Sequence, residues 1–406
     1  MTQINHEILS WSRRTAGLTL EEASRKLHFS NTKKKSAADK LRSLETGESI
    51  PTKQTLEKMA QVYRRPLIIF YLEKIPAKTE LVTDFRRKKT NVTDRENALL
   101  DALIRDVKLR QETIREIIED EYTNESKKTE SGSAFQTDLS EIFFKRQLSL
   151  DLTIPSAAKI VSDSIHFDIT AFRRKRTKED AFRYLRNCVE ESGIFVLIVG
   201  NLGHSTTKLD TDVFRGFSLF DPIAPFVVVN GNDAKGALSF TLFHEVVHIF
   251  LAQSVVSNGE LENKTESFCD KVASEILIPM SDLEPLKFVG NLDKIELISQ
   301  IDQFAKMNNV SGSMLALRLY KINIISEQKY KLLHDHFYQA WLHQKEEMKK
   351  KDDKNGPTFR TTKRSQLGAG LLTLVHSYLS SGSISVSTAG KILGVAPRHV
   401  AAILEN

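Results

Sequence analysis

The sequence predicts an α+β protein that is mainly helical, with a small sheet placed just before an apolar helix. Two observations carry this prediction. Apolar residues recur every three or four positions through most of the 406 residues, and three short β-prone runs lie close together at 193–200, 214–220 and 225–233. With 40% hydrophobic and 27% charged residues, the chain can bury a sizeable core and form several domains.

The composition also argues against some classes of protein. No run of 18 or more apolar residues occurs, so no transmembrane helix is expected. The first residues, MTQINHEILSWSRRTAG, lack the hydrophobic region of a signal peptide. The only cysteines are Cys188 and Cys269, which indicates a reducing compartment rather than a disulfide framework. We therefore expect a cytoplasmic protein with no membrane partner.

Positive charge is concentrated at the N-terminal end. Residues 1–90 contain 19 Lys and Arg against 10 Asp and Glu, a net charge of +9, whereas the whole chain carries only +6. The remaining residues are therefore slightly acidic. This asymmetry indicates an anionic partner such as nucleic acid, or alternatively a basic surface that is merely solvated.

The N-terminal residues have the pattern of five short helices. Thr19 can cap the second helix, with Glu22 as its capping-box partner. After the basic insert HFSNTKKK, Ser36 can open a third helix. TKQTLEKMAQVY predicts a fourth helix, and RPLIIFYL a fifth with Pro66 at its start.

The phrases LTLEEASRKL and ADKLRSLETGESIPTKQTLEKMAQVY resemble the XRE (lambda-repressor-like) helix-turn-helix family over roughly residues 4–72. The resemblance implies a DNA-binding domain at 1–75 in which the helix 36–45 enters the major groove. The side chains that this helix would present to DNA are Ser36, Lys40 and Arg42.

Two features of this segment keep an alternative open. Asp39 lies on the same helix and would be unusual beside phosphates, and the insert lengthens the turn between the second and third helices. Helix-turn-helix folds also serve as protein-docking modules, so docking or autoregulation is the alternative to DNA binding.

The middle of the chain is predicted to connect two modules. Residues 76–150 contain a long amphipathic helix at about 94–119, followed by the polar linker TNESKKTESGSAFQTD. Helical patterns resume near residue 155, before the three strands. The strands are followed by FTLFHEVVHIFL, which predicts a helix that is apolar almost all round.

That helix carries two histidines four residues apart, so His244 and His248 share one face. A catalytic zinc ion needs three protein ligands and one open position. The HExxH spacing supplies two of them, with Glu245 placed to act as general base for a zinc-activated water that attacks a peptide carbonyl. HExxH also recurs by chance on amphipathic helices, but burying these groups without a cation would cost several kcal/mol.

A third ligand is expected from the helix NKTESFCDKVASEILIP, residues 263–279. Glu266 and Asp270 lie four apart and share a face. Glu266 is the predicted third ligand, and Asp270 is predicted to accept a hydrogen bond from the non-ligating nitrogen of His244. By spacing alone, the two carboxylates are more typical of a solvated helix face than of a metal site.

The motifs FTLFHEVVHIFL and ESFCDKVASEILIP together closely resemble the ImmA/IrrE metallopeptidases, over roughly residues 4–320. The resemblance implies a gluzincin-like, zincin-fold domain at 151–290, with zinc, or manganese as the alternative in the cell, bound by His244, His248 and Glu266. Glu245 would be the base. Cys269 and Asp270 stand where the family usually has Ala and Asn; a small buried residue is the preferred interpretation of Cys269, and a metal ligand is the alternative.

The resemblance further implies a bacterial or phage-related protease that cleaves a helix-turn-helix repressor, encoded nearby, in response to stress or mobile-element signals. The strand PFVVVN directly precedes the HExxH helix, and an exposed edge there would pair with an extended substrate segment. The rival hypothesis is a DNA-binding regulator in which the zinc fold senses a signal without catalysis.

The C-terminal part predicts two further helical segments. Residues 291–342 resemble a helix-turn-helix-like pair, and 343–406 comprise a charged, exposed linker followed by three small helices. Sensing, docking and helical packing all remain open for this last segment.

Overall fold

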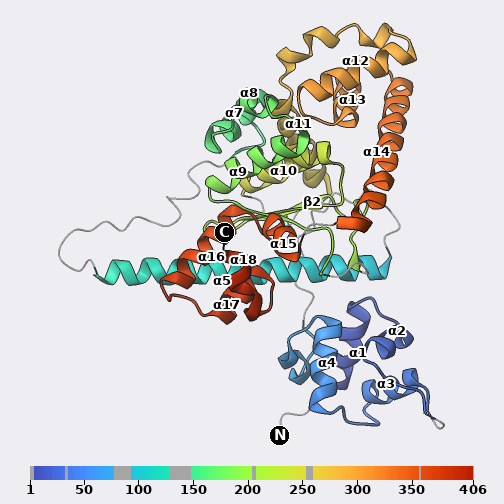
Figure 1. Cartoon of the computed structure of the whole chain (residues 1–406), viewed down its shortest axis with the longest axis vertical. Helices are drawn as coiled ribbons and strands as arrows, with labels where there is room; N and C mark the ends of the chain where they lie inside the picture. The colour runs from blue at the N-terminus through green and yellow to red at the C-terminus, as the bar shows by residue number, and fades with distance from the viewer. Residues whose placement is uncertain are drawn as a thin grey trace. The chain divides into compact units, whose positions relative to one another are not determined.

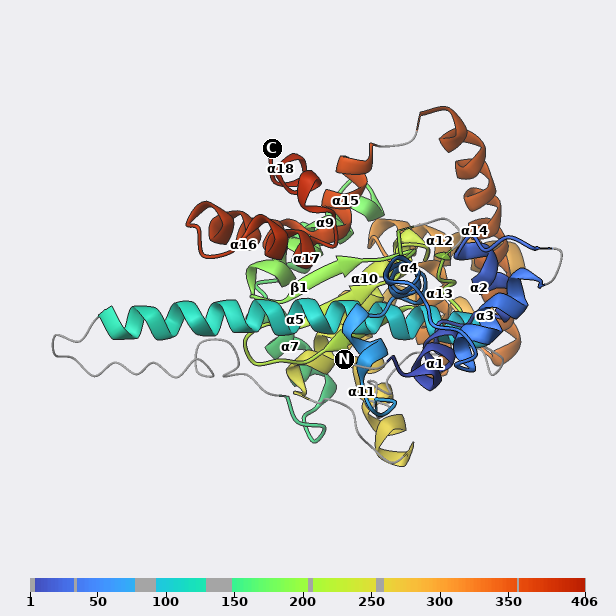
Figure 2. The same cartoon turned by 90° about the horizontal axis from the view of Figure 1, so that it is seen from below.

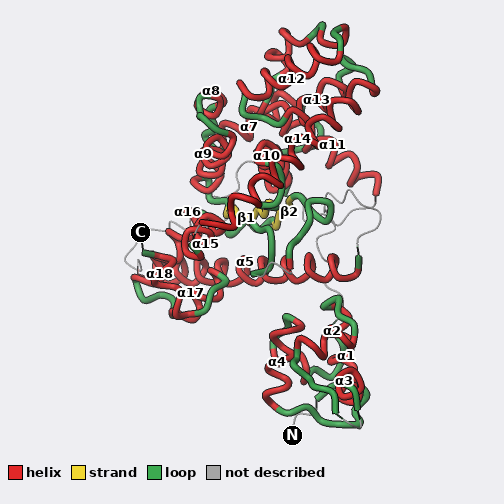
Figure 3. Tube along the Cα trace, turned by 45° about the vertical axis from the view of Figure 1, so that its right-hand side comes forward, coloured by secondary structure: helices red, strands yellow, loops and turns green. Residues whose placement is uncertain are grey.

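The computed structural model describes residues 4–32, 35–76, 93–128, 148–203, 207–252, 259–355 and 358–405. The chain divides into two compact units. One comprises Met1–Thr83, Arg87–Val107 and Asn201–Phe214, and the other comprises Asp84–Arg86, Lys108–Gly200 and Arg215–Asn406. The architecture is mainly helical with one three-stranded sheet (Figures 1 and 3), which confirms the predicted α+β class.

The first unit contains most of the elements predicted near the N-terminus. Its helices are α1 (His6–Thr15), α2 (Leu20–Lys26), α3 (Ala37–Glu45), α4 (Lys53–Tyr63) and the 3₁₀ helix η1 (Leu67–Tyr71). The capping box between Thr19 and Glu22 is present. The fifth predicted helix is only a five-residue 3₁₀ turn, because the chain is already extended at Pro66 and again at Leu72.

A buried ion pair holds α1 against α3 in this unit. The Nε of Arg13 donates to Oε1 of Glu45 at 2.7 Å, and Nη2 donates to Oε2 at 3.0 Å. The remaining terminal nitrogen of Arg13 donates to the carbonyl of Leu18. Such a bidentate pair fixes the relative position of two helices more firmly than a single contact would.

The second unit is built around the sheet and its covering helices. Its first helices are the later half of α5 (Asp94–Lys128, which contributes to both units), α7 (Ile154–Ser164), α8 (Ile169–Arg173), α9 (Lys178–Glu191), α10 (Lys235–Phe250) and α11 (Gly259–Leu277). The predicted connector helix is therefore longer than expected at its C-terminal end. Residues 129–147, which include most of the predicted polar linker, lie outside the described residues.

The sheet has the strand order β1-β3-β2, with β1 (Phe195–Ile198), β2 (Gly216–Leu219) and β3 (Phe226–Val229). All three strands were predicted. β3 pairs with β1 in parallel and with β2 antiparallel, so it is the central strand and is fully buried. The expectation that PFVVVN offers an exposed edge is therefore wrong, because both edges of β3 are already hydrogen-bonded; β2 is the edge strand nearest α10.

Helices cover both faces of this sheet. α10 packs against β2 and β3, and α9 packs against β1. The later half of α5 crosses the opposite side of the sheet (Figure 2). There the side-chain nitrogen of Gln111 donates to the carbonyls of Leu219 and Ala224, at 2.8 and 2.9 Å, and so closes the end of the β2–β3 connection.

The rest of the second unit is helical. Its elements are η3 (Met280–Leu286), η4 (Val289–Asn291), α12 (Lys294–Met307), α13 (Gly312–Lys321), α14 (Glu327–Asn355), α15 (Phe359–Leu367), α16 (Ala369–Ser380), α17 (Val386–Leu393), η5 (Pro397–His399) and α18 (Val400–Leu404). The charged stretch 343–364, expected as a linker, is helical at 343–355 and 359–364, and Thr358 is the extended N-cap residue of α15. Among the described residues, no helix combines the length and apolarity that crossing a membrane requires.

A buried arginine fastens the C-terminal helices to the sheet. The Nε of Arg186 on α9 donates to Glu190 at 2.8 Å, and its terminal nitrogens donate to the carbonyls of Val196 on β1 and of Ser365 and Gln366 on α15. Glu190 in turn accepts a hydrogen bond from the backbone N–H of Gly370 at 3.0 Å.

Candidate metal centre

α10 places three polar side chains in an otherwise apolar environment. The helix follows β3 directly, and nearly all of its residues are buried between the sheet, α9 and α11. Within it, His244, Glu245 and His248 are 1%, 4% and 3% exposed. Ionisable groups at this depth need partners or a bound cation.

α11 completes a cluster of three ligand-type donors. Glu266 points its carboxylate at both histidines: Oε2 lies 3.2 Å from Nε2 of His244, and Oε1 lies 2.9 Å from Nε2 of His248. The two Nε2 atoms are 3.1 Å apart. In the described part of the chain, this is the one group of His, Cys, Asp or Glu side chains assembled closely enough for a metal.

These separations fit a tetrahedral zinc ion. Ligands about 2.0–2.1 Å from zinc lie roughly 3.3 Å from one another at the corners of a tetrahedron. The three measured separations are slightly shorter than this edge, and a small outward movement of each side chain would seat the ion. Glu266 is 25% exposed, so solvent reaches the cluster on the α11 side. The assignment of the three ligands stays a prediction that this geometry favours.

Asp270 lies one turn after Glu266 and approaches the other nitrogen of His244. Its Oδ1 is 3.0 Å from Nδ1 of His244, and its Oδ2 is 3.4 Å from Nζ of Lys321 on α13. A carboxylate in this place favours the tautomer with the proton on Nδ1, which leaves the lone pair of Nε2 directed at the cluster.

The charge around His248 also favours a cation. Burial alone would lower the pKa of His248, but Cys269, Glu266 and Glu245 together raise it well above its ordinary value. An imidazole in this setting is surrounded by electron-rich donors that attract a proton or a metal ion. Burial raises the pKa of the Cys269 thiol, and this fully buried residue is not part of the three-donor cluster.

Glu245 is held by two residues of the edge strand β2 that sequence reasoning missed. The hydroxyl of Ser218 donates to Oε2 of Glu245 at 3.1 Å. A Cβ on Gly216 would lie 2.9 Å from Oε1 of Glu245 and 2.7 Å from Cγ2 of Thr241, so only glycine leaves room there. A glycine inside a strand often marks such a close approach, and this was the available signal in FRGFSLF.

The residues predicted to contact DNA lie together on α3 and at its N-cap, although all three also have local partners. Ser36 caps the helix by accepting from the N–H of Asp39, and Nζ of Lys40 donates to the carbonyl of Ser30 at 2.6 Å. Arg42 is exposed and lies 3.7 Å from Asp39. The connection from α2 to α3 spans residues 27–36, longer than the three or four residues of a standard helix-turn-helix.

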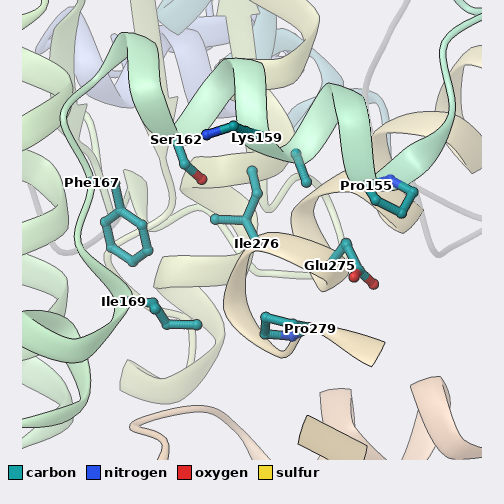
Figure 4. Close-up of a pocket in the computed structure, with 9 residues that line it drawn as sticks. Pro155, Lys159, Ser162, Phe167, Ile169, Glu275, Ile276 and Pro279 are labelled. Carbon is teal, nitrogen blue, oxygen red and sulfur yellow. The ribbon is translucent and has the colours of Figure 1, made fainter. Parts of the chain in front are cut away.

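A separate hollow of about 230 Å³ lies between α7 and the end of α11 (Figure 4). Ile276, Pro279 and Ile169 are among the side chains that line it. Ile276 follows Glu266 by ten residues, which is about 15 Å along a helix. The hollow is therefore not part of the metal cluster.

Comparison with known proteins finds one related domain, and it contains the cluster. Residues 199–320 match the family model of the IrrE N-terminal-like domain, Peptidase_M78. No curated protein and no solved structure matches the chain. The match covers less than a third of the sequence but includes β2, β3, α10 and α11, and the N-terminal helices lie outside it. The part of the chain that carries His244, Glu245, His248 and Glu266 is thus similar to the metallopeptidases of the ImmA/IrrE type.

Proposed function

We propose that this protein is a zinc-dependent, site-specific endopeptidase. The observation that carries the proposal is the juxtaposition on α10 and α11 of three donors spaced for a tetrahedral ion with a buried carboxylate, Glu245, that is not one of them. The match to the IrrE N-terminal-like domain supports the same reaction class.

Each residue would have a distinct task. When bound by His244, His248 and Glu266, zinc would supply the Lewis acidity that polarises a peptide carbonyl and lowers the pKa of a water molecule. Glu245 takes a proton from the attacking water and passes it to the leaving amine. Ser218 keeps the Glu245 carboxylate in one orientation by donating to Oε2.

The substrate we propose is a regulatory protein, in particular a helix-turn-helix repressor encoded near this gene. β2 is the edge strand beside the general base, so an extended segment of the substrate would pair with β2 rather than with β3. Cleavage of such a repressor would derepress its genes under stress or on a mobile-element signal, and the reaction would take place in the cytoplasm.

We also propose that residues 1–75 contact duplex DNA. The net charge of +9 over residues 1–90 and the exposure of Arg42 on α3 support this. Docking of a protein partner on the same helices is the alternative, since the long α2–α3 connection departs from the standard geometry.

The test is incubation of the zinc-loaded protein with the repressor encoded beside it, followed by mass spectrometry over time. Two complementary repressor fragments are expected with the native protein. The Glu245→Gln variant should leave the repressor intact while still binding zinc. If neither protein cuts the repressor but both relieve repression in cells, the non-catalytic regulator replaces the protease.

A further inference from the structure

A strongly basic hollow lies where α8 joins α9, and it is independent of the proposed peptidase reaction. Its volume is about 390 Å³. The residues that line it are Arg174, Lys175, Arg176, Asp180, Arg183, Tyr184 and Asn187. Four cations and one carboxylate give the lining a net charge of +3, although the chain beyond residue 90 is slightly acidic as a whole.

Two of the four cations have no side-chain partner in the described part of the chain. Lys175 lies over the ring of Tyr184, at 4.8 Å from its centroid, and Arg183 pairs with Asp180 at 3.2 Å. The guanidinium groups of Arg174 and Arg176 are exposed, and neither makes a side-chain hydrogen bond or ion pair with any described residue. Their donors are therefore available to a ligand.

Hydrogen bonds from a buried asparagine fix the backbone segment 172–175, which carries two of these cations. The buried side-chain nitrogen of Asn309, in the turn between α12 and α13, donates to the carbonyls of Phe172, Arg173 and Lys175, at 3.1, 3.2 and 2.9 Å. Arg173 itself turns away and pairs with Asp282 at 2.6 Å. A fixed loop gathers like charges before any ligand arrives, which lowers the entropic cost of binding.

The lining indicates the chemistry of the ligand. Repulsion among gathered cations is relieved best by a ligand that carries several negative charges within a few ångströms, and guanidinium groups match phosphate oxygens in pairs. Tyr184 is the one aromatic side chain of the lining, and Nζ of Lys175 already lies over its ring at 4.8 Å from the centroid. The lining therefore offers cations rather than a stacking surface for a nucleobase. The volume is that of a small-ligand site.

We propose that this hollow binds an oligophosphate, that is, two or more adjacent phosphate groups recognised through Arg174 and Arg176. A nucleoside diphosphate or triphosphate and inorganic polyphosphate share this chemistry. The recognised part is the phosphate chain in either case.

The experiment is calorimetric titration of the full-length protein with pyrophosphate, tripolyphosphate, ATP and inorganic phosphate at constant ionic strength. Pyrophosphate is expected to bind more tightly than phosphate. The variant Arg174→Gln with Arg176→Gln should weaken pyrophosphate binding by about tenfold or more, since two charge-assisted contacts are lost. The matched control is Lys159→Gln with Lys331→Gln, which removes the same charge from lysines already paired with Asp163 and Glu327. It should bind as the native protein does.

A variant that binds pyrophosphate more tightly than the native protein cannot owe its effect to loss of folding. Asp180→Asn removes the one carboxylate of the lining and should tighten pyrophosphate binding several-fold. Equal affinities for ATP and tripolyphosphate would support recognition of the phosphate chain. Equal weakening by the lysine control would overturn the proposal, because the binding would then reflect net charge alone. Binding of a single-stranded oligonucleotide through Arg174 and Arg176 without binding of pyrophosphate would also overturn it.

Discussion

The hydroxyl of Ser218 on strand β2 donates a hydrogen bond of 3.1 Å to the carboxylate of Glu245 on helix α10. The two residues are 27 positions apart, and the contact joins the edge strand of the sheet to the proposed general base. A substrate strand paired with β2 would thus lie beside the carboxylate that is proposed to take a proton from the attacking water.

Removing this hydrogen bond should slow cleavage without removing the metal. Ser218→Ala is expected to lower kcat by about tenfold or more, since a hydrogen bond to a charged group is worth roughly 1.5 kcal/mol or more. KM and zinc content should change little. Ser218→Thr keeps a hydroxyl and should restore part of the rate. A change confined to KM would mean that Ser218 binds substrate rather than holding Glu245.

Gly216→Ala should disturb Glu245 by crowding. The new Cβ would meet Thr241 at 2.7 Å and Glu245 at 2.9 Å, so one of them must move. We expect a loss of about 1–3 kcal/mol in unfolding free energy, measured by urea denaturation, together with slower cleavage. Adding Thr241→Ser removes the closer of the two contacts and should recover part of the stability. Native stability in the single variant would contradict the tight approach of β2 to α10.

Substitutions at the metal cluster should differ in whether the protein still binds zinc. His244→Ala, His248→Ala and Glu266→Ala should each lose zinc, which is about one ion per chain in the native protein, because each removes a donor from the cluster. Glu245→Gln should retain zinc. Elemental analysis of the purified variants measures this directly. Full zinc retention by Glu266→Ala would remove it as third ligand and direct attention to Asp270.

The C-terminal helices should depend on Arg186. Arg186→Leu leaves Glu190 buried without its cation, and breaking a buried pair costs about 3–5 kcal/mol. The expected result is a lower urea midpoint and faster proteolysis within residues 358–405. The double variant Arg186→Leu with Glu190→Leu removes both charges and should be more stable than the single variant. If the double variant is the less stable of the two, the loss comes from packing and not from an unpaired charge.

Binding of duplex DNA by the full-length protein should weaken steeply with salt, because phosphate contacts release counterions. Lys40→Ala with Arg42→Ala should reduce both the affinity and the salt slope. Lys53→Ala with Lys58→Ala removes equal charge from α4 and serves as the control. Unchanged binding in the first pair would favour the docking alternative for residues 1–75. The readout is fluorescence anisotropy of a labelled duplex over a range of salt concentrations.

The sequence by itself determined the local features of this protein. Periodicity within one helix is set by neighbouring residues, so His244 and His248 had to share a face. The capping box of Thr19 and Glu22 likewise depends only on two residues that lie three positions apart. The existence of three short strands followed from β-prone runs bounded by turns, and the class α+β followed from them.

Contacts between elements were decided only by the tertiary structure. The spacing of Glu266 was more typical of a solvated helix face, and only the packing of α11 on α10 brings it within 3.2 Å of His244. The strand order makes β3 central and β2 an edge strand, so the substrate segment is expected to pair with β2 and not with β3. The same arrangement brings Ser218 of β2 into contact with Glu245. Asn309, 137 positions from Phe172, shapes the basic hollow. Such pairings depend on which apolar surfaces can be buried together over the whole unit, and no short stretch of sequence contains that information.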